Sequence, residues 1–366
     1  MKVVQVLPSL DGGGVERGTL EVAKGLVDAG HESIVVSAGG RMVAQLETEG
    51  SRHVAWDLGR KSPLTFRHVG GLRRWLRREK PDILHLRSRL PAWVCWFAWN
   101  GLPERERPHL VTTVHGLYSV SRYSAIMCRG ERVIAVSGTV RDYIRENYPQ
   151  TDMDKIRLIY RGVNPEEFPY GYRPSDEWLA RWYQMYPRLQ SQKVLTLPGR
   201  LTRLKGHHDF IDLIKRLRGS GLPVQGLIVG GEDPKRKAYA RELRERIARE
   251  GLGEYILLTG ARQDIREVFA VSDLVLSLST KPESFGRTVV EALTMGVPVI
   301  GYDHGGVGEV LGQLYPRGLV PMSDATALDQ AVRASLDSAQ PRPHNDRFLL
   351  GDMIEQTLAC YRELTQ

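Results

Sequence analysis

The residues best suited to chemistry lie in one segment, STKPESFGRTVVEALTMGVPVIGYDHGGVGE, which covers residues 279–309. Glu283 and Glu291 stand eight positions apart. On a helix this separation is two turns plus about 80°, so both carboxylates can address one elongated ligand from the same side. Gly286 is the expected start of that helix, where backbone amides bind anions. The amides concerned belong to Ser284, Phe285, Gly286 and Arg287.

Two cations stand in a second segment, LPGRLTRLKGHHDF, which follows an apolar strand and precedes a helix. Arg200 and Lys205 would both reach the mouth of one crevice, and paired cations of this kind neutralise a diphosphate. Ordinary surface charge explains either residue equally well when it is taken alone. The two segments together favour a site for a phosphorylated ligand.

A glycine-rich turn and a histidine follow two strands of the N-terminal half. In SLDGGGVERG the strand VVQVL runs into Gly12, Gly13 and Gly14, where glycines let a ligand approach the backbone closely. The spacing is not that of the dinucleotide motif GxGxxG, and a simple tight turn is the alternative. His115, in TTVHG, lies at a strand end, where a lone histidine is more often structural.

The elements that must position these residues follow a βαβ rhythm, because short β-branched runs alternate with amphipathic stretches. The runs are nearly continuous in apolar residues, which predicts parallel strands covered on both faces. Ligands of such sheets bind beyond the carboxyl ends of the strands. The rhythm stops at an irregular stretch, residues 169–190, and then restarts, so two sheets in two domains are expected. The expected strand runs are VVQVL, ESIVVSA, DILHL, HLVTTV and RVIAVS, then KVLTLPGR, VQGLIVGG, YILLTG, DLVLSLS and VPVIGY.

The GGGVERG loop, the GRLTRLKG and ESFGRTVVE segments and the GGVGE turn resemble the retaining glycosyltransferases of family 4, which have the two-domain GT-B fold. The resemblance spans nearly the whole chain, and the E-x7-E spacing combined with GRLTRLKG is highly specific. It implies an α/β chain of two Rossmann-like domains that face a central cleft. The expected parts are an acceptor-binding domain at residues 1–170, a nucleotide-sugar-binding domain at 171–345, and a C-terminal helix at 346–366 that returns to the first domain.

The same resemblance implies roles for single residues. Arg200 and Lys205 bind the donor diphosphate, Glu291 accepts hydrogen bonds from the ribose hydroxyls, and Glu283 contacts the transferred sugar. His115 matches the family's histidine beside the sugar and the reacting centre. The other implied contacts are the base-holding loop of Gly260, Ala261 and Arg262, the donor-side helix start of Ser284, Phe285, Gly286 and Arg287, and the phosphate and acceptor loop of Gly12, Gly13 and Gly14.

Two features stand apart from this pattern. Many relatives carry Pro-Asn where IYRGVN has Tyr160 and Arg161, and a local packing change is the simpler explanation. Asp152 and Asp154 form a D-x-D pair of the kind that binds metal in glycosyltransferases of the other major fold. Here the pair lies between a helix and a strand, where aspartates usually form turns. We expect no metal and no cofactor, because two cations and a helix start are available to the departing diphosphate.

Composition places the chain among ordinary globular proteins. Its 366 residues exceed the usual size of one domain, and 42% are hydrophobic and 26% charged. No secretion signal or membrane span is evident, and three scattered cysteines suit a reducing compartment. We therefore expect a cytoplasmic protein, with the inner face of the cytoplasmic membrane as a candidate location.

The net charge of +8 is concentrated in the N-terminal half, most densely from Arg60 to Arg89. Apolar residues of LTFRHVGGLRRWLRRE roughly follow helical spacing, which predicts arginines on the opposite face. Such a face attracts anionic lipid headgroups or an anionic acceptor, and a solvated helix without a partner is the alternative. The apolar residues are Leu64, Val69, Leu72, Trp75 and Leu76.

The implied reaction transfers a sugar from a nucleoside diphosphate sugar to a hydroxyl of a glycan or glycolipid acceptor, with the anomeric configuration retained. UDP is the first choice of nucleotide, ahead of GDP and ADP, and lipopolysaccharide or cell-surface polysaccharide biosynthesis is the expected pathway. Another GT-B enzyme, such as a sugar-nucleotide epimerase or a phosphorylase, is the closest rival. A nucleic-acid-binding protein would need a recognition motif that the sequence lacks, and a non-enzymatic scaffold would leave the E-x7-E pattern unexplained.

Overall fold

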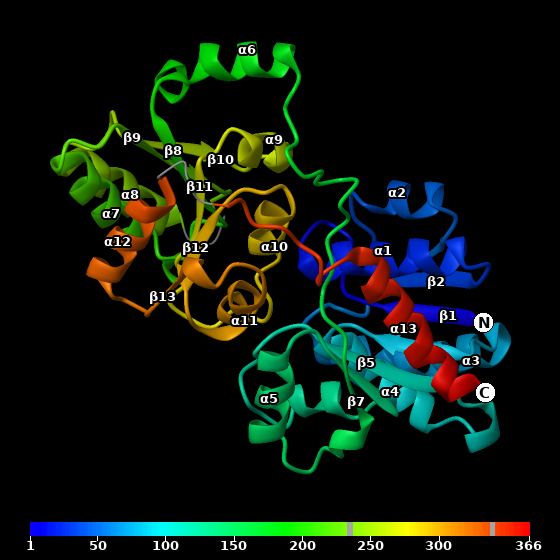
Figure 1. Cartoon of the computed structure of the whole chain (residues 1–366). Coiled ribbons are helices and arrows are strands. Elements are labelled where there is room, and N and C mark those ends of the chain that lie inside the picture. Colours follow the sequence, from blue (N-terminus) through cyan, green and yellow to red (C-terminus); the bar gives the residue numbers. More distant parts are fainter. Residues whose placement is uncertain (233–236, 337–340) are drawn as a thin grey trace. The chain divides into compact units, whose positions relative to one another are not determined.

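The chain folds into two compact units, seen in the computed structural model of Figure 1, which describes residues 1–232, 237–336 and 341–366. The first unit comprises Met1–Arg161 together with Leu350–Gln366, and the second comprises Gly162–Leu349. Each unit has its own parallel sheet, with helices on both faces. The two doubly wound sheets that the sequence predicts are therefore confirmed.

The first unit is built on a seven-stranded parallel sheet in the order β3-β2-β1-β4-β5-β6-β7. Its strands are β1 (Lys2–Val6), β2 (Glu32–Ser37), β3 (Arg52–Ala55), β4 (Ile83–Leu86), β5 (His109–Val114), β6 (Arg132–Ala135) and β7 (Ile156–Leu158). Its helices are α1 (Gly14–Asp28), α2 (Val43–Thr48), α3 (His68–Glu79), α4 (Arg89–Asn100), α5 (Gly138–Asn147) and α13 (Leu350–Thr365). The short edge strand β3 was not predicted, and β7 is the strand expected after Asp152 and Asp154.

The last helix, α13, packs beside α1 in the first unit (Figure 1). Gly25 of α1 makes room for it, because a Cβ at that position would lie 2.5 Å from Cγ2 of Ile354. Tyr361 of α13 is fully buried, and its hydroxyl lies 2.6 Å from Nδ1 of His85 in β4. The C-terminal helix is thus part of the first unit's core.

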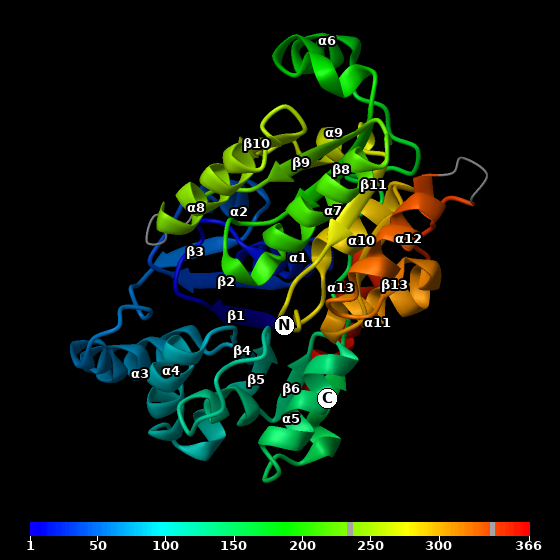
Figure 2. The same ribbon diagram turned by 90° about the vertical axis from the view of Figure 1, so that its left-hand side faces the viewer.

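The second unit is built on a six-stranded parallel sheet in the order β10-β9-β8-β11-β12-β13. Its strands are β8 (Lys193–Pro198), β9 (Val224–Val229), β10 (Ile256–Gly260), β11 (Leu274–Ser277), β12 (Val299–Tyr302) and β13 (Leu319–Val320). Its helices are α6 (Asp176–Met185), α7 (His207–Gly219), α8 (Lys237–Arg249), α9 (Ile265–Ala270), α10 (Arg287–Thr294), α11 (Gly305–Leu314) and α12 (Ala325–Leu336). Helices α7, α8 and α12 cover one face of this sheet, with α7 and α8 side by side in Figure 2.

The first unit ends at Arg161, whereas the sequence placed the boundary at residue 170. Residues 162–171 belong to the second unit because their backbone bonds there, with Val163 N donating to Phe348 O and Gly171 N donating to Met295 O. The C-terminal helix begins at Leu350, four residues later than expected.

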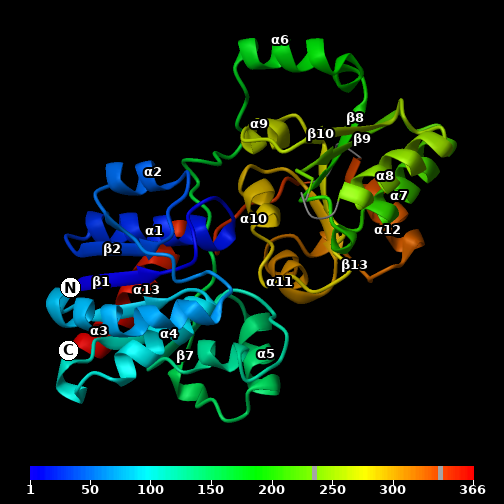
Figure 3. The same ribbon diagram turned by 180° about the vertical axis from the view of Figure 1, so that it is seen from behind.

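The stretch at residues 169–190, expected to be irregular, contains helix α6, which Figure 3 shows standing out from the rest of the second unit. The Ser175 side chain caps the helix by accepting from Trp178 N, and Trp182 is buried. A serine followed by two acidic residues was the available signal for a helix start.

The basic run of the first unit divides into surface and interior residues. Helix α3 begins at His68, after a 3₁₀ turn at Pro63–Arg67, so Leu64 precedes it and is 69% exposed instead of packing on the helix's apolar face. Arg87 is only 2% exposed, because it follows strand β4 directly and donates to the Gln5 side chain at 2.8 Å. The run is therefore not one continuous cationic surface.

Candidate active site

The loop after β8 carries the two predicted cations of the second unit. It ends at Gly206, which has φ +69° and whose Cβ, if present, would lie 2.0 Å from the Leu278 carbonyl oxygen. Only glycine allows this approach. The approach brings the 3₁₀ turn Arg203–Lys205 against the end of strand β11, where the loop that contains Glu283 begins.

Lys205 and Glu283 are brought together as an ion pair. The Lys205 ammonium lies 2.6 Å from Oε1 of Glu283, and both side chains are about three-quarters buried, at 29% and 26% exposure. The Ser279 hydroxyl donates to the same carboxylate oxygen. The lysine predicted to bind a diphosphate therefore forms an ion pair with a carboxylate of the same unit.

The loop from Ser279 to Gly286 is fixed by the start of helix α11. Gly306 N donates to the Glu283 carbonyl at 2.7 Å, and Nε2 of His304 lies 2.9 Å from the Ser279 carbonyl. A Cβ on Gly306 would lie 2.4 Å from Cα of Phe285, so the close packing requires glycine. These supporting contacts explain the GG pair of the GGVGE turn, which sequence reasoning did not explain.

The prediction that one helix directs both carboxylates of the E-x7-E pair is wrong for Glu283. Helix α10 begins at Arg287 after Gly286, which has φ +92°, so Glu283 lies in the preceding loop and its direction is not set by the helix period. Glu291 is inside the helix, 4% exposed, and its carboxylate lies 3.0 Å from Nε of Arg287. The two carboxylates therefore differ in burial, at 26% and 4% exposure.

The remaining donor-side residues lie at neighbouring strand ends. Arg200 is exposed just after β8 and makes no ion pair within the described part of the chain. Gly260 ends β10 with φ +72°, and a Cβ on Gly231 would lie 3.3 Å from the Ala261 side chain. Ser284 and Phe285 precede Gly286 in the loop before α10. Each of these residues therefore lies at or after the carboxyl end of a strand in the second unit's sheet.

The Arg262 side chain is engaged away from the loop backbone. It forms an ion pair with Asp264 at 2.5 Å and lies over the Trp182 ring at 5.3 Å from the centroid. Because both contacts already engage the guanidinium, the Arg262 side chain is poorly placed to bind a nucleotide base. A contact of residues 260–262 with a nucleotide base would therefore use the backbone.

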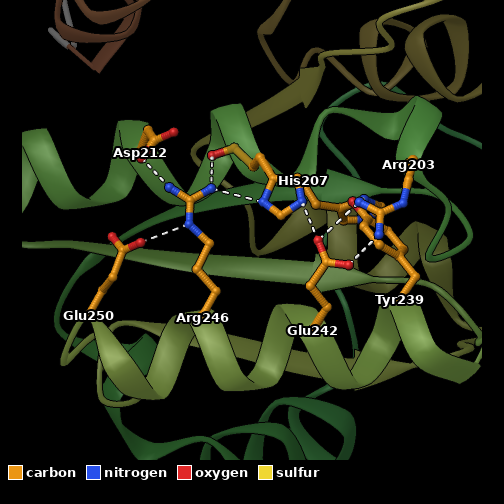
Figure 4. Close-up of polar contacts among 8 residues, drawn as sticks. Arg203, His207, Asp212, Tyr239, Glu242, Arg246 and Glu250 are labelled. Carbon is orange, nitrogen blue, oxygen red and sulfur yellow. Dashed lines mark hydrogen bonds and ion pairs between the residues drawn. The ribbon is translucent and has the colours of Figure 1, made fainter.

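Arg203, in the same turn as Lys205, is directed to helix α8. Figure 4 shows its guanidinium paired with Glu242, and one of these hydrogen bonds measures 3.0 Å. Farther along α8, Arg246 pairs with Asp212 at 2.5 Å and with Glu250 at 2.8 Å. The Arg203–Glu242 pair ties the turn that holds Lys205 to α8, and Arg246 ties α8 to α7 through Asp212. Arg203 therefore anchors the turn without reaching toward Glu283.

In the first unit, the glycine loop ends as predicted at a helix start. Helix α1 begins at Gly14, and Gly13 precedes it without a side-chain cap. Gly12 and Gly13 have φ values of +145° and +153°, which favour glycine. The first amides of α1 are therefore available to an anion instead of a capping side chain.

His115 follows strand β5, and its ring is held by Arg161. Nη2 of Arg161 lies 2.5 Å from Nδ1 of His115. A guanidinium can only donate hydrogen bonds, so Nδ1 must accept, and the proton of the neutral ring lies on Nε2. Nε2 is buried and has no hydrogen-bond partner in the described residues. Arg161, which sequence analysis assigned to local packing, therefore sets the tautomer of a candidate site residue.

A buried polar network lies next to this pair. Burial, together with Arg161, Arg87 and His85, holds the pKa of His115 well below its usual value. Burial and the same two arginines also hold the pKa of His85 well below its usual value, and its Nε2 lies 2.6 Å from the Thr113 hydroxyl. Burial lowers the pKa of Arg87 to about 10. Both histidines are therefore neutral at ordinary pH.

The D-x-D pair forms a turn. The Asp152 side chain accepts from Asp154 N at 3.0 Å and caps a short 3₁₀ helix, as the sequence indicated. Within residues 1–232, 237–336 and 341–366, no group of three or more His, Cys, Asp or Glu side chains could hold a metal ion.

Both halves of the chain match known glycosyltransferase families. Residues 12–167 match the family described as Glycosyltransferase Family 4, and residues 184–347 match Glycosyl transferases group 1. The chain belongs to glycosyltransferase family 4. It is an enzyme that transfers sugars, and its two sheets are those of the GT-B fold.

Two curated relatives differ in how much of the chain they cover. A 2-deoxystreptamine N-acetyl-D-glucosaminyltransferase of Streptomyces fradiae is 32% identical over 45% of this chain and 40% of its own length, so that match spans less than half of the relative. An N-acetyl-alpha-D-glucosaminyl L-malate synthase of Bacillus anthracis is 26% identical over 93% of this chain and 88% of its own length.

Solved structures resemble the whole chain. A glycosyltransferase from Rickettsia africae ESF-5 is 29% identical, with a TM-score of 0.87 over 100% of this glycosyltransferase and 98% of that chain. HepE from Anabaena, solved with UDP and glucose, is 22% identical, with a TM-score of 0.84 over 99% and 100% of the two chains. The second likeness concerns the fold alone.

Proposed function

We propose that this glycosyltransferase moves a sugar from a nucleoside diphosphate sugar, with UDP as the nucleotide, to a hydroxyl of a glycan or glycolipid, and retains the anomeric configuration. The observation that carries the proposal is the Lys205–Glu283 pair beside the start of α10. The UDP and glucose in HepE, and the N-acetylglucosaminyl groups in the names of two relatives, support a UDP-sugar donor.

The difficult step is breaking the bond between the sugar and the diphosphate while the sugar becomes oxocarbenium-like. Lys205 and the exposed Arg200 supply two cations to the departing diphosphate, and the amides at the start of α10 supply donors. Lys205 and the start of α10 are part of the folded unit before the ligand arrives, and the diphosphate competes with Glu283 for Lys205. With these donors available, the proposed mechanism needs no metal ion and no cofactor.

Glu283 holds hydroxyls of the transferred sugar in this proposal. Its Oε1 already accepts from Lys205 and Ser279, which lowers the nucleophilicity of that oxygen. We therefore favour a positioning role over covalent attack, with departure and attack on the same face of the sugar. Glu291, which is buried and rigid on α10, accepts hydrogen bonds from the ribose.

His115 lies beside the reacting sugar in the proposed mechanism. In its neutral form with Nε2 protonated, it can donate a hydrogen bond without placing positive charge next to a cationic transition state. We place the acceptor with the first unit, whose α1 start has uncapped amides at Gly13 and Gly14. A glycan or glycolipid of lipopolysaccharide or cell-surface polysaccharide biosynthesis is the proposed acceptor class.

Substitution of the two cations tests the proposal. Lys205→Ala and Arg200→Ala should each lower turnover about 10²–10³-fold, which is the usual cost of losing a preorganised charge contact. Arg203→Ala is the matched control, because Arg203 lies in the same turn but pairs with α8. Near-normal turnover in both site variants, or an equal loss in the control, would contradict the proposed site.

Ligand-induced stabilisation identifies the nucleotide. A ligand that binds the native state raises the midpoint of thermal unfolding. We expect UDP and UDP-sugars to raise it more than GDP, ADP and their sugars at equal concentration. Stabilisation by GDP or ADP alone would replace UDP in the proposal and leave sugar transfer intact.

A further inference from the structure

An aromatic patch lies on the surface of the first unit, outside the candidate active site. It consists of the exposed Phe97 on α4 and Phe66 on the 3₁₀ turn Pro63–Arg67, together with Trp93 and Trp96 of α4, which are partly buried against the core. Their rings are in edge or tilted contact, with centroids 5.2–5.9 Å apart. Phe66 is 39% exposed and Phe97 is 42% exposed. Large aromatic side chains are seldom gathered in this way on a surface without a partner.

Two further exposed residues continue the patch along the chain. Leu64 precedes Phe66 in the same 3₁₀ turn, and Tyr123 is 43% exposed. Trp93 Nε1 donates to the Tyr123 carbonyl at 2.9 Å, so the loop that follows His115 borders α4. Figure 2 shows α3 and α4 side by side on this part of the unit.

Cations surround the aromatic patch. The Arg129 guanidinium lies over both Trp93 and Trp96, 5.5 and 5.0 Å from the ring centroids. Arg67 directly follows Phe66 and is exposed, as are Lys61 and Arg122. Segments 58–78, 87–103 and 115–130 contain no Asp or Glu. The charge of these segments is therefore uniformly positive.

This surface differs from the arginine face of α3 that the sequence indicated. Arg77 on α3 pairs with Glu106 at 2.8 Å, and Arg73 lies against Gly101. Arg87 is buried, and Arg89 lies over the Tyr118 and Tyr123 rings, 4.6 and 5.5 Å from their centroids. The cations in contact with the rings of this surface are therefore Arg129 and Arg89, and neither belongs to α3.

We propose that the aromatic patch and its cations dock this glycosyltransferase on a bilayer that contains anionic phospholipid. Tryptophan and phenylalanine favour the boundary between headgroups and acyl chains, and arginine and lysine attract anionic headgroups. The charge decides between occupants, since a second copy of this surface would bring like charges together. Among the described residues, no helix is long and apolar enough to cross a membrane.

A bilayer bound at this surface is where a glycolipid acceptor would be presented to the enzyme. Binding of the bilayer does not depend on the proposed reaction. The segment 115–130 begins at His115 and ends beside the patch at Arg129 and Gly130. A lipid-linked acceptor in the bilayer would therefore meet the same loop that leads from the candidate site.

Vesicle co-sedimentation of the full chain, without sugar nucleotide, tests the proposal. We expect binding to phosphatidylcholine vesicles that contain phosphatidylglycerol, little binding to phosphatidylcholine alone, and weaker binding as salt rises. The double substitution Phe66→Ser and Phe97→Ser should lower the partition coefficient about tenfold or more. Lys61→Gln and Arg67→Gln should each lower it about fivefold.

Matched controls come from the second unit. Met322→Ser removes an exposed apolar side chain of 50% exposure, and Arg249→Gln removes an exposed cation. Both should leave binding unchanged, and thermal unfolding of each variant checks that it is folded. Hydrolysis of the sugar nucleotide by the patch variants reports on the proposed function separately, and we expect it to be normal.

Three results would overturn the proposal. The first is absence of binding to the anionic vesicles at low salt. The second is equal binding to neutral vesicles, or an equal loss in the patch variants and the controls. The third is a change of oligomeric state in the Phe66→Ser, Phe97→Ser variant without any vesicle binding by the wild type, which would make the patch an interface between two copies.

Discussion

The contact between Arg161 and His115 leads to a prediction about tautomer and pH. Substitution Arg161→Met removes the guanidinium and keeps an apolar stem, whereas Arg161→Lys keeps a positive charge and a donor. In the wild type, Nδ1 of His115 accepts from Arg161 at 2.5 Å. We expect Arg161→Met to release the ring, so that the Nε2-protonated tautomer is no longer enforced.

The size of the effect follows from the hydrogen bond that is lost. A hydrogen bond to a charged group contributes about 1.5–3 kcal/mol, which corresponds to a preference on the order of tenfold to a hundredfold between the two ring states. We therefore expect turnover in Arg161→Met to fall on the order of tenfold, with Arg161→Lys in between. The substrate KM should change less, because nothing in the proposal places Arg161 against the donor.

The sign of the pH effect is set by the lowered pKa of His115, which burial causes first and Arg161 second. A His with a lowered pKa stays neutral as pH falls through 6.5, so wild-type turnover should show no acid limb there. Loss of Arg161 raises the pKa of His115, and the acid limb should move to higher pH in Arg161→Met. An imidazolium next to an oxocarbenium-like sugar is unfavourable, which is why turnover falls.

Nitrogen-15 NMR of histidine-labelled protein checks the tautomer directly, with His115→Gln used to assign the signal. We expect an unprotonated Nδ1 and a protonated Nε2 for His115 in the wild type, and tautomer exchange in Arg161→Met. A protonated Nδ1 in the wild type, or an identical spectrum and pH profile in Arg161→Met, would refute the reasoning.

The remaining predictions concern the second unit and stability. Glu283→Gln should lower turnover but tighten UDP binding, because the carboxylate no longer competes with phosphate for Lys205. The expected gain in affinity is about two- to fivefold, which is the scale of a partly exposed ion pair. Weaker UDP binding in a calorimetric titration would contradict this prediction. Gly206→Ala should lower the free energy of unfolding by at least about 2 kcal/mol, because the added Cβ would clash with the Leu278 carbonyl oxygen. Gly251→Ala is the control, since Gly251 has the same φ of +69° but open space around it, and it should cost only about 1 kcal/mol. Equal losses in denaturant titrations would show that the clash at Gly206 has no effect. Burial lowers the pKa of His207 to about 4, so the folded protein holds this side chain in its neutral form. The free energy of unfolding should therefore be full above pH 6.5 and fall by up to about 1.4 kcal/mol per pH unit between pH 6.5 and 4. His207→Gln should reduce that slope, and an unchanged slope would exclude His207 as the cause of the pH dependence.

Much of the fold was predictable because buried parallel strands leave a strong local signal. Runs such as DILHL and VQGLIVGG are apolar on both faces and coincide with β4 and β9. Their carboxyl ends meet at one edge of each sheet, so Lys205 and Glu283 could be expected near each other, although 78 positions separate them. Helix α6 was not predicted because its apolar residues are mainly aromatic and prolines flank it. These prolines favoured an irregular segment, although Ser175 is a residue type that often begins a helix.

The pairing of individual side chains could not be predicted in the same way. Arg161 meets His115 across 46 positions, and no periodic pattern records such a contact. Arg87 belongs to a dense basic run, and its burial depends on Gln5 in β1, the strand beside β4. The loop position of Glu283 depends on how Gly306 packs against Phe285. These features arise from tertiary packing, which sequence spacing does not specify.

A crystal structure with UDP bound tests the central claim most directly. The account predicts the diphosphate within hydrogen-bond distance of Lys205 and Arg200, at the start of α10, with the ribose against Glu291. A diphosphate bound elsewhere, with no contact to residues 200–205 or to the start of α10, would contradict the account.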